Sequence, residues 1–158
     1  MALTQDDIKA SYPLPVYNYK VDIGKDTVAF AEVSGLNISY ETHTYKESST
    51  EAGKAGPTVF HMPAQRSNTT LTLKKGLVPA KSKAALYDWI NSVRLNQVSK
   101  KDILISLNDE TGKAVVTWTV SNAFPTKLSV PDFDAKSNDV AIESMELMAD
   151  TIAINYEA

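Results

Sequence analysis

The feature that most constrains this chain is the alternation of apolar and polar residues in short stretches separated by turn residues. In one such stretch, between Ser67 and Lys74, two leucines alternate with polar side chains. The leucines are Leu71 and Leu73, and the polar members are Thr70, Thr72 and Lys74. Side chains of a strand point alternately to its two faces, so this pattern predicts a strand with one buried and one wet face.

The same reasoning predicts the other strands, since the apolar stretches are short and have turn residues between them. They are expected at residues 16–23, 29–33, 38–45, 103–107, 115–120, 140–147 and 151–154. Asn108–Gly112 is a turn-rich loop of a length that joins antiparallel strands. Gly35 separates two strands at a point where a bulge or a sharp bend is expected.

A single helix is predicted, from about Ser82 to Asn96. Its apolar face recurs at helical spacing and consists of Leu86, Trp89, Ile90 and Val93. Trp89 is expected to anchor the helix to the core, and Trp118 is expected to reach the core from a strand. The predicted fold is therefore mainly β, an antiparallel β-barrel or sandwich with one flanking helix.

The chain of 158 residues is expected to form one domain, with two segments that differ from the rest. Residues 1–12 are predicted to be a flexible arm. Residues 46–63 are predicted to be an extended loop between strands. Its part from Lys46 to Pro57 is polar and rich in glycine, so it buries too little apolar area to offset its ordering entropy. That part is expected to be mobile in a monomer.

Composition excludes several classes of protein. A net charge of -3 argues against a surface that binds nucleic acid, and the lack of cysteine removes disulfides and thiolate chemistry. The first ten residues carry acids where a signal peptide has positive charge, which predicts cytoplasmic synthesis and assembly. Apolar runs such as Ile103–Ile105 are far short of the roughly 20 residues that cross a bilayer.

The sequence holds no catalytic motif, and neither a cofactor nor a metal ion is expected. His43 and His61 lack the spacing of zinc ligands. The acidic pairs Asp109/Glu110 and Asp132/Asp134 lie in expected turns, where solvated acids are common. The chain is therefore interpreted as a protein that is not an enzyme.

Several short blocks occur in a fixed order along most of the chain. They are Pro15-Val16-Tyr17, Glu32-Val33-Ser34-Gly35-Leu36, Leu73-Lys74-Lys75-Gly76, Leu86-Tyr87-Asp88-Trp89-Ile90 with Arg94, Asp102-Ile103 through Leu107-Asn108-Asp109, Asn122-Ala123-Phe124-Pro125 and Ala141-Ile142-Glu143-Ser144-Met145-Glu146-Leu147. In this order the chain resembles the inner tube proteins of contractile injection systems and phage tails, a group similar to the Hcp protein of type VI secretion.

The resemblance implies a barrel that forms six-membered rings, which stack into a hollow tube inside a contractile sheath. Contraction of the sheath drives the tube through a target membrane, and the tube conducts cargo. The implied partners are further copies of the chain, the sheath protein, baseplate and tube-initiator or cap proteins, and effector cargo in the lumen. Nucleic acid would only pass through the tube, in a phage tail.

Within such a tube, the predicted loop occupies the place of the segment that reaches the neighbouring ring. Its candidate stacking residues are Lys46, Glu47, Glu51, Gly53, Lys54 and Gly56. The wet strand face formed by Thr70, Thr72 and Lys74 is a candidate lining of the lumen.

Other interpretations stay open at this point. Within the family, the chain could be a baseplate-proximal tube initiator or a secreted type VI Hcp-like ring protein. In a different class, it could be a monomeric ligand-binding β-barrel, and the loop could be an ordinary surface loop. A free particle, a phage tail and a membrane-anchored system are all compatible with the sequence.

Overall fold

The computed structural model describes residues 2–157. Its longest strand, β8 (Ala114–Ser129), pairs with three other strands. Its first half pairs with β7 (Lys101–Asn108) and β10 (Thr151–Tyr156), and its second half pairs with β9 (Ile142–Ala149). Asn122 lies between the halves with a φ of 54°, in the left-handed region that asparagine tolerates. A strand that bends and changes sheets forms the corner between two packed layers.

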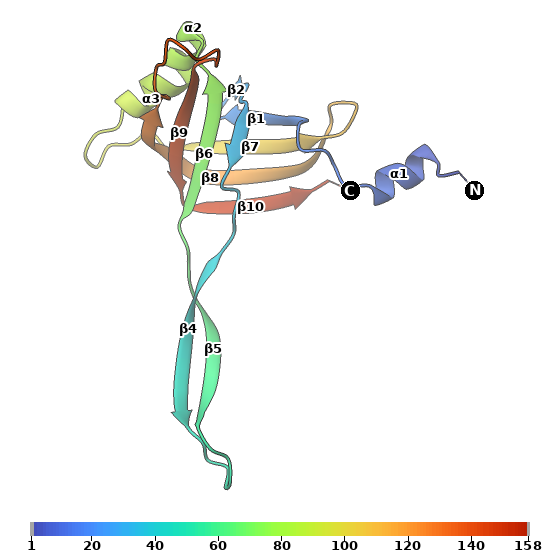
Figure 1. Ribbon diagram of the computed structural model, residues 1–158, viewed down its shortest axis with the longest axis vertical. Helices are drawn as coiled ribbons and strands as arrows, with labels where there is room; N and C mark the ends of the chain where they lie inside the picture. Colours follow the sequence, from blue (N-terminus) through green and yellow to red (C-terminus); the bar gives the residue numbers. More distant parts are fainter. Residues whose placement is uncertain (1, 158) are drawn as a thin grey trace.

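The two layers cross one another in Figure 1. The first contains β2 (Asp26–Val28), β1 (Tyr19–Ile23), β7, β8 and β10, and the second contains β8, β9, β6 (Thr69–Gly76) and β3 (Glu32–Ser34). All pairings are antiparallel, as predicted. The sheet is not closed into a barrel, however. Its path ends at β2 and β3, strands of only three residues that do not pair with each other.

The hydrophobic core lies between the two layers. Leu71 and Leu73 of β6 are fully buried, and the β9 residues Met145 and Leu147 pack with them. From the other layer, β7 and β8 contribute Ile103, Ile105 and Val120. The leucine alternation therefore predicts the buried face of β6 correctly.

The helix covers the core over residues 79–91, as α2 (Pro79–Ser82), the π-helical turn η1 (Lys83–Tyr87) and α3 (Asp88–Asn91). It starts earlier than predicted because Pro79 is favoured in a first turn. It ends before the predicted Asn96, since Ser92 closes it by donating from its hydroxyl to the Trp89 carbonyl at 2.6 Å. Val93 therefore lies beyond the helix and outside the core cluster, which corrects its expected role.

The other predicted anchors lie against the core. Leu86 is fully buried and Trp89 is 4% exposed, while Ile90 and Trp118 are half-buried and pack against the same cluster. The indole N–H of Trp89 donates to the Ser99 carbonyl at 2.8 Å. This bond satisfies the polar atom of a buried aromatic side chain.

The segment predicted as a loop is mostly a β-hairpin that extends away from the body (Figure 1). Its strands are β4 (Tyr40–Ser48) and β5 (Pro57–Arg66), which pair with each other to form a separate sheet. Only residues 49–56 at its tip lack strand structure. The prediction of an irregular segment over residues 46–63 missed β5, where Val59 and Phe60 are good strand formers.

The predicted flexible arm contains a helix, α1 (Gln5–Ser11), that stands away from the body (Figure 1). Thr4 caps it, because the Thr4 hydroxyl accepts from the Asp7 N–H at 3.2 Å and the Asp7 carboxylate accepts from the Thr4 N–H at 3.1 Å. No residue of α1 is buried. Within residues 2–157, no helix is long and apolar enough to cross a membrane.

Candidate assembly surfaces

One face of the β4–β5 hairpin carries aromatic and apolar side chains. Tyr45 and Phe60 are directly opposite each other, and their rings stack with centroids 6.2 Å apart. His43 and Met62 form the pair two positions along, which places them on the same face. Tyr45 remains 53% exposed and Phe60 43% exposed. An isolated two-stranded hairpin is marginally stable in water, so this face is suited to contact with another chain.

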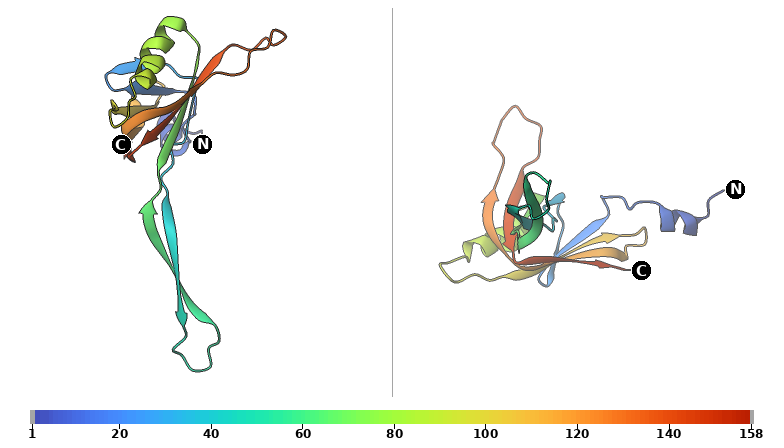
Figure 2. Two further views of the ribbon diagram at one scale, coloured as in Figure 1. Left: turned by 90° about the vertical axis from the view of Figure 1, so that its left-hand side faces the viewer. Right: turned by 90° about the horizontal axis from the view of Figure 1, so that it is seen from below.

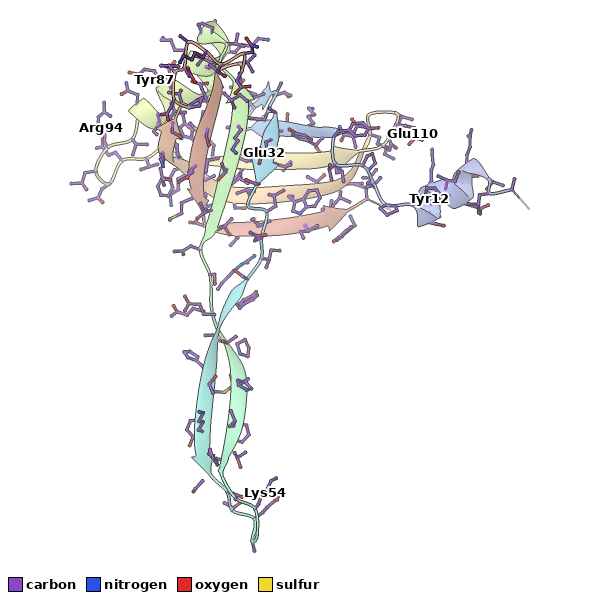
Figure 3. All side chains as sticks on the ribbon, in the orientation of Figure 1. Tyr12, Glu32, Lys54, Tyr87, Arg94 and Glu110 are labelled. Carbon is purple, nitrogen blue, oxygen red and sulfur yellow. The ribbon has the colours of Figure 1, made fainter. Side chains whose placement is uncertain are left out.

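The predicted stacking residues all belong to this hairpin or its tip. Lys46 and Glu47 are consecutive residues of β4 and therefore point to opposite faces. The tip contains Glu51, Gly53, Lys54 and Gly56, and Figure 3 shows Lys54 at the far end. The Lys54 ammonium lies 3.3 Å from the Glu51 carboxylate in an exposed ion pair. Gly53 and Gly56 have φ values of 82° and 86°, which favour glycine.

The sequence prediction missed the apolar face of the hairpin. The signal was available, because Phe60 and Met62 alternate with Val59 and His61 as strand residues do. His43 and His61 lie on neighbouring strands but belong to adjacent residue pairs, so they point to opposite faces. Within residues 2–157, no group of three or more His, Asp or Glu side chains is arranged to hold a metal ion.

The hairpin is fastened to the body at its base. The guanidinium of Arg66 donates to the carbonyl of Ile152 in β10 at 2.9 Å. The same group lies 6.0 Å from the ring centre of Tyr40. These contacts orient the base of the hairpin, and beyond it β4 and β5 form a separate two-stranded sheet.

The polar face of β6 is opposite to the core. Thr70 is exposed, and Thr72 and Lys74 are half-buried, which places the three predicted lumen residues together on one surface. The Lys74 ammonium lies 3.5 Å from the Glu32 carboxylate of β3. The sequence did not identify the residues beside them on β9, where Ser144 pairs with Lys74 and Glu146 pairs with Thr72.

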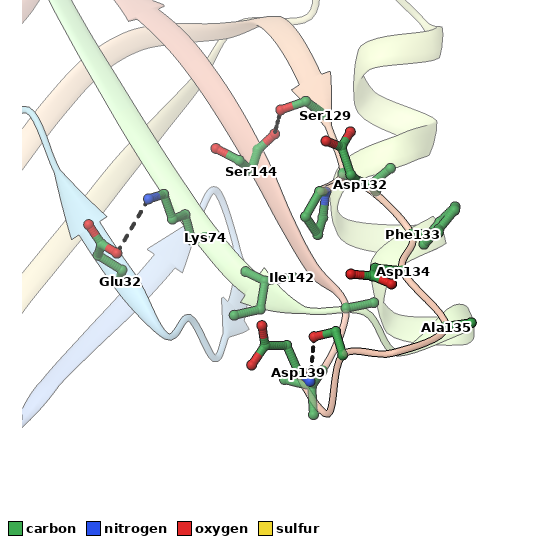
Figure 4. A pocket seen from close by; sticks show the side chains of 15 residues that line it. Glu32, Lys74, Ser129, Asp132, Phe133, Asp134, Ala135, Asp139, Ile142 and Ser144 are labelled. Atoms are coloured by element: carbon green, nitrogen blue, oxygen red, sulfur yellow. Dashed lines mark hydrogen bonds and ion pairs between the residues drawn. The ribbon is translucent and has the colours of Figure 1, made fainter.

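A hollow of about 1240 Å³ lies beside this face, under the loop that joins β8 to β9, residues 130–141. Figure 4 shows the loop residues Asp132, Phe133 and Asp134 together with the Glu32–Lys74 ion pair. The Phe133 side chain is 82% exposed. The Asp134 carboxylate accepts from the backbone N–H of Lys136 at 3.0 Å, which matches the expected turn. The hollow itself was not predicted.

An ion pair connects α1 to the turn between β7 and β8. The Lys9 ammonium lies 2.6 Å from the Glu110 carboxylate, and both groups are exposed. The hydrogen bond from Lys9 lowers the pKa of Glu110, and the same bond raises the pKa of Lys9. Hydrogen bonds from Thr111 and Lys113 lower the pKa of Asp109 in the same turn. Asp109 and Glu110, the acidic pair noted in the sequence, are thus both surface groups of a turn.

Residues 15–153 match the family model described as T4-like virus tail tube protein gp19. The match covers most of the chain, so the protein belongs to this tail tube family. The resemblance found in the sequence blocks is thereby confirmed. No curated protein is significantly similar to the chain.

Two solved structures are similar over nearly the whole length. A chain of the sheath-tube complex of PVC, an extracellular contractile injection system in the extended state, is 44% identical with a TM-score of 0.88, over 99% of this chain and 100% of that one. A chain of the anti-feeding prophage tube-terminating cap is 45% identical with a TM-score of 0.84, over the same shares of both chains. Hcp1 from Flavobacterium johnsoniae is 13% identical, over 89% of this chain and 97% of that one, and its TM-score of 0.51 shows a shared fold alone.

Proposed function

We propose that this protein is the structural subunit of the inner tube of a contractile injection system. Six copies form a ring, rings stack into a hollow tube, and sheath contraction drives the tube through a target membrane. The tube conducts cargo and acts without catalysis. The observation that carries this proposal is the similarity, over the full length of both chains, to a chain of an extracellular sheath-tube complex, together with membership of the tail tube family.

The exposed surfaces support an assembling subunit. The apolar hairpin face, the edges of both sheets and the Phe133 loop lie open to solvent in the single chain. Free strand edges and apolar patches are aggregation hazards unless partner copies cover them. A ring covers such surfaces with identical neighbours. The proposed outer partners are the sheath, the baseplate and a tube initiator or cap, and the complete particle acts outside the cell.

A ligand-binding barrel is less well supported by the geometry. Small ligands are usually held in enclosed clefts lined by apolar side chains. Here the sheet is open, and the hollow under the β8–β9 loop is bordered by the ion pair of Glu32 and Lys74 and by several aspartates. A surface of this kind fits contact with another chain better than enclosure of a small apolar molecule.

The test is negative-stain electron microscopy of the purified full-length chain, combined with size-exclusion chromatography. The proposal predicts rings with a central pore that grow into tubes of indefinite length as concentration rises. Single rings that never stack would favour the tube initiator or the secreted ring protein. A protein that stays monomeric at all concentrations and binds a small apolar ligand would contradict the tube proposal.

A further inference from the structure

We infer that a hollow between the helix and the β1–β2 hairpin binds a compact oxyanion, a phosphate or carboxylate group, which ties together the two ends of the open sheet. The hollow measures about 510 Å³. We call it the lysine hollow, because three of the residues that line it are Lys75, Lys81 and Lys101. All of its lining belongs to one chain, so the site does not depend on ring formation.

The lysine hollow lies where the two ends of the sheet approach each other without pairing. The path of strands ends at β2 and β3, and residues 29–31 lead from one to the other. The Ala31 N–H donates to the Lys74 carbonyl at 2.7 Å, which holds this connection against β6. Figures 1 and 2 show β2 and the helix close together, at the end of the body away from the β4–β5 hairpin. A ligand in the hollow would contact β2, β6 and the helix at once.

The lining of the hollow is basic, although the chain as a whole has a net charge of -3. Lys75, Lys81 and Lys101 line it together with a single acid, Asp26. Among the described residues, none of these four side chains forms an ion pair within 4.0 Å. Ammonium groups that surround one hollow repel each other, and an anion bound among them would offset that repulsion.

Lys75 supplies a buried donor to the wall of the hollow. The residue is 5% exposed, and its ammonium donates to the Gly76 carbonyl at 3.0 Å. An ammonium has three N–H donors, and the Gly76 carbonyl uses one of them. Hydrogen bonds between an ammonium and an oxyanion are stronger than those to a neutral carbonyl. A bound oxyanion would therefore accept a strong hydrogen bond from Lys75.

Lys101 and Lys81 complete the set of cations. Lys101 is half-buried, and its ammonium lies 5.0 Å from the ring centre of Trp89. This cation–π contact holds the ammonium in place without neutralising its charge. Lys81 of α2 is exposed at the rim, where its long side chain can move onto a ligand. One buried, one fixed and one mobile cation suit a compact group with more than one negative charge.

Isothermal titration calorimetry of the full-length chain, at constant ionic strength, tests binding of pyrophosphate and of citrate. One of the two should bind saturably, once per subunit, and the tighter one identifies phosphate or carboxylate as the preferred group. Lys101→Met should weaken binding about tenfold, because it removes a charged donor. Lys81→Met should weaken it about twofold to fivefold, as expected for an exposed charge, and Asp26→Asn should tighten it about twofold.

The matched control is Lys113→Met, which removes the same charge from an exposed lysine that does not line the hollow. It should bind like the wild type. Equal weakening by Lys113→Met and Lys101→Met would show attraction to the whole surface and overturn the inference. A folded wild-type chain that binds neither anion saturably would also overturn it.

Chemical labelling locates the anion independently of these variants. The tighter of the two anions should slow acetylation of Lys81 and Lys101 by N-hydroxysuccinimidyl acetate, measured by mass spectrometry. Acetylation of Lys113 should not change. Protection of all three lysines alike, or of none, would contradict binding in the hollow.

Amide hydrogen exchange tests whether the anion ties the ends of the sheet together. The tighter anion should slow exchange in residues 26–31, because it connects β2 to β6 and the helix. Phosphate-type salts also stabilise proteins in general, since they are excluded from the surface. The double variant Lys81→Met/Lys101→Met controls for this effect and should show no such slowing. Equal slowing in the wild type and the double variant would overturn the proposed tie.

Discussion

Lys75 and Glu143 face each other across β6 and β9 on the buried side of the sheet. They are partners in the strand register, and each is at least nine-tenths buried. The Lys75 ammonium donates to the Gly76 carbonyl at 3.0 Å, and Oε2 of Glu143 is buried with no hydrogen-bond partner. Among the described residues, no ion pair within 4.0 Å joins the two. We expect their opposite charges to offset each other across the strands, since both side chains are buried on the same face of the sheet.

The first prediction concerns this balance. Glu143→Leu alone should lower the free energy of unfolding by about 3 kcal/mol, because it leaves the buried Lys75 ammonium without a counter-charge. The double variant Lys75→Met/Glu143→Leu should recover most of that loss, since well-packed apolar pairs often replace buried charges without cost. Urea unfolding of all three proteins measures the difference. Equal losses in the single and double variants would show that the two charges are independent.

The second prediction concerns the helix anchor. Trp89→Ala should lower the free energy of unfolding by about 3–5 kcal/mol, because it removes a buried aromatic side chain from the contact between helix and sheets. Trp89→Phe is the control, which keeps the ring but loses the bond to the Ser99 carbonyl, worth about 1 kcal/mol. Thermal and urea unfolding provide the measurement. A melting temperature of Trp89→Ala within a degree or two of wild type would refute the core role of Trp89.

These residues show which parts of the fold the sequence could predict. Side chains that are buried within the subunit recur in the sequence at the period of their strand or helix. The sequence therefore predicts correctly that the leucines of β6 and the apolar face around Leu86 and Trp89 are buried. The bend at Asn122 was not predicted, because one strand serves two layers and only the tertiary packing decides where it turns. The sequence predicts a barrel or a sandwich without deciding between them, because it does not indicate whether β2 and β3 pair with each other.

Gly35 lies where only glycine fits, and the sequence indicated this constraint only in part. Its φ is 92°, and a Cβ at Gly35 would collide with the carbonyl oxygen of Thr70. The sequence predicted a bend there, but not the close approach of β6. The apolar face of the hairpin was harder to predict, because Tyr45 and Phe60 are exposed in the single chain and lie outside its core cluster.

The third prediction concerns the hairpin tip. Deleting Glu51–Gly56 should leave a folded subunit, because no residue of the tip is buried. The shortened hairpin should reach less far along the next ring, so single rings should outnumber tubes. Electron micrographs give the ratio, and circular dichroism verifies the fold. Tubes of normal length from the deletion variant would mean that the tip is an ordinary surface loop.

The fourth prediction concerns the connection of α1 to the body. The Glu110 pKa is lowered from its ordinary value of 4.5. The contribution of the Glu110 carboxylate to the ion pair with Lys9 is therefore complete above pH 4.5 and is lost as pH falls through the lowered pKa. The Lys9 pKa is raised from 10.5, so its contribution is complete below 10.5 and is lost as pH rises through the raised value. The ion pair between Lys9 and Glu110 should therefore persist between pH 4.5 and pH 10.5 and should break in strong acid.

Fluorescence anisotropy of a dye on Leu3→Cys measures the mobility of the arm. Anisotropy should fall in strong acid, and Glu110→Gln should show the low value already at pH 7. Acid also weakens the Thr4 cap, because its hydrogen bonds lower the pKa of Asp7. Lys9→Met keeps that cap and separates the two effects. If Lys9→Met retains the wild-type anisotropy at pH 7, the ion pair does not hold the arm.

The last prediction concerns the lumen. A polar surface formed by Thr70, Thr72 and Lys74, with Ser144 and Glu146 beside them, should give a hydrophilic channel if this face lines the tube. A subunit charge of -3 gives six times that value, or -18, per six-membered ring, yet charges more than about 8 Å apart are screened at physiological salt. The local lining should therefore govern cargo, which should bind without a tight apolar site and less strongly as salt increases.

Retention of a polar polypeptide by assembled tubes, measured at low and high salt, tests this expectation. Thr70→Leu/Thr72→Leu should retain apolar peptides that the wild type releases, since it places two apolar side chains on the wet face of β6. Its monomer should unfold within about 1 kcal/mol of wild type, because Thr70 is exposed and Thr72 is half-buried on the face opposite to the core. An apolar lumen in a density map of the tube, or cargo retention that does not change with salt, would contradict the assignment of this face.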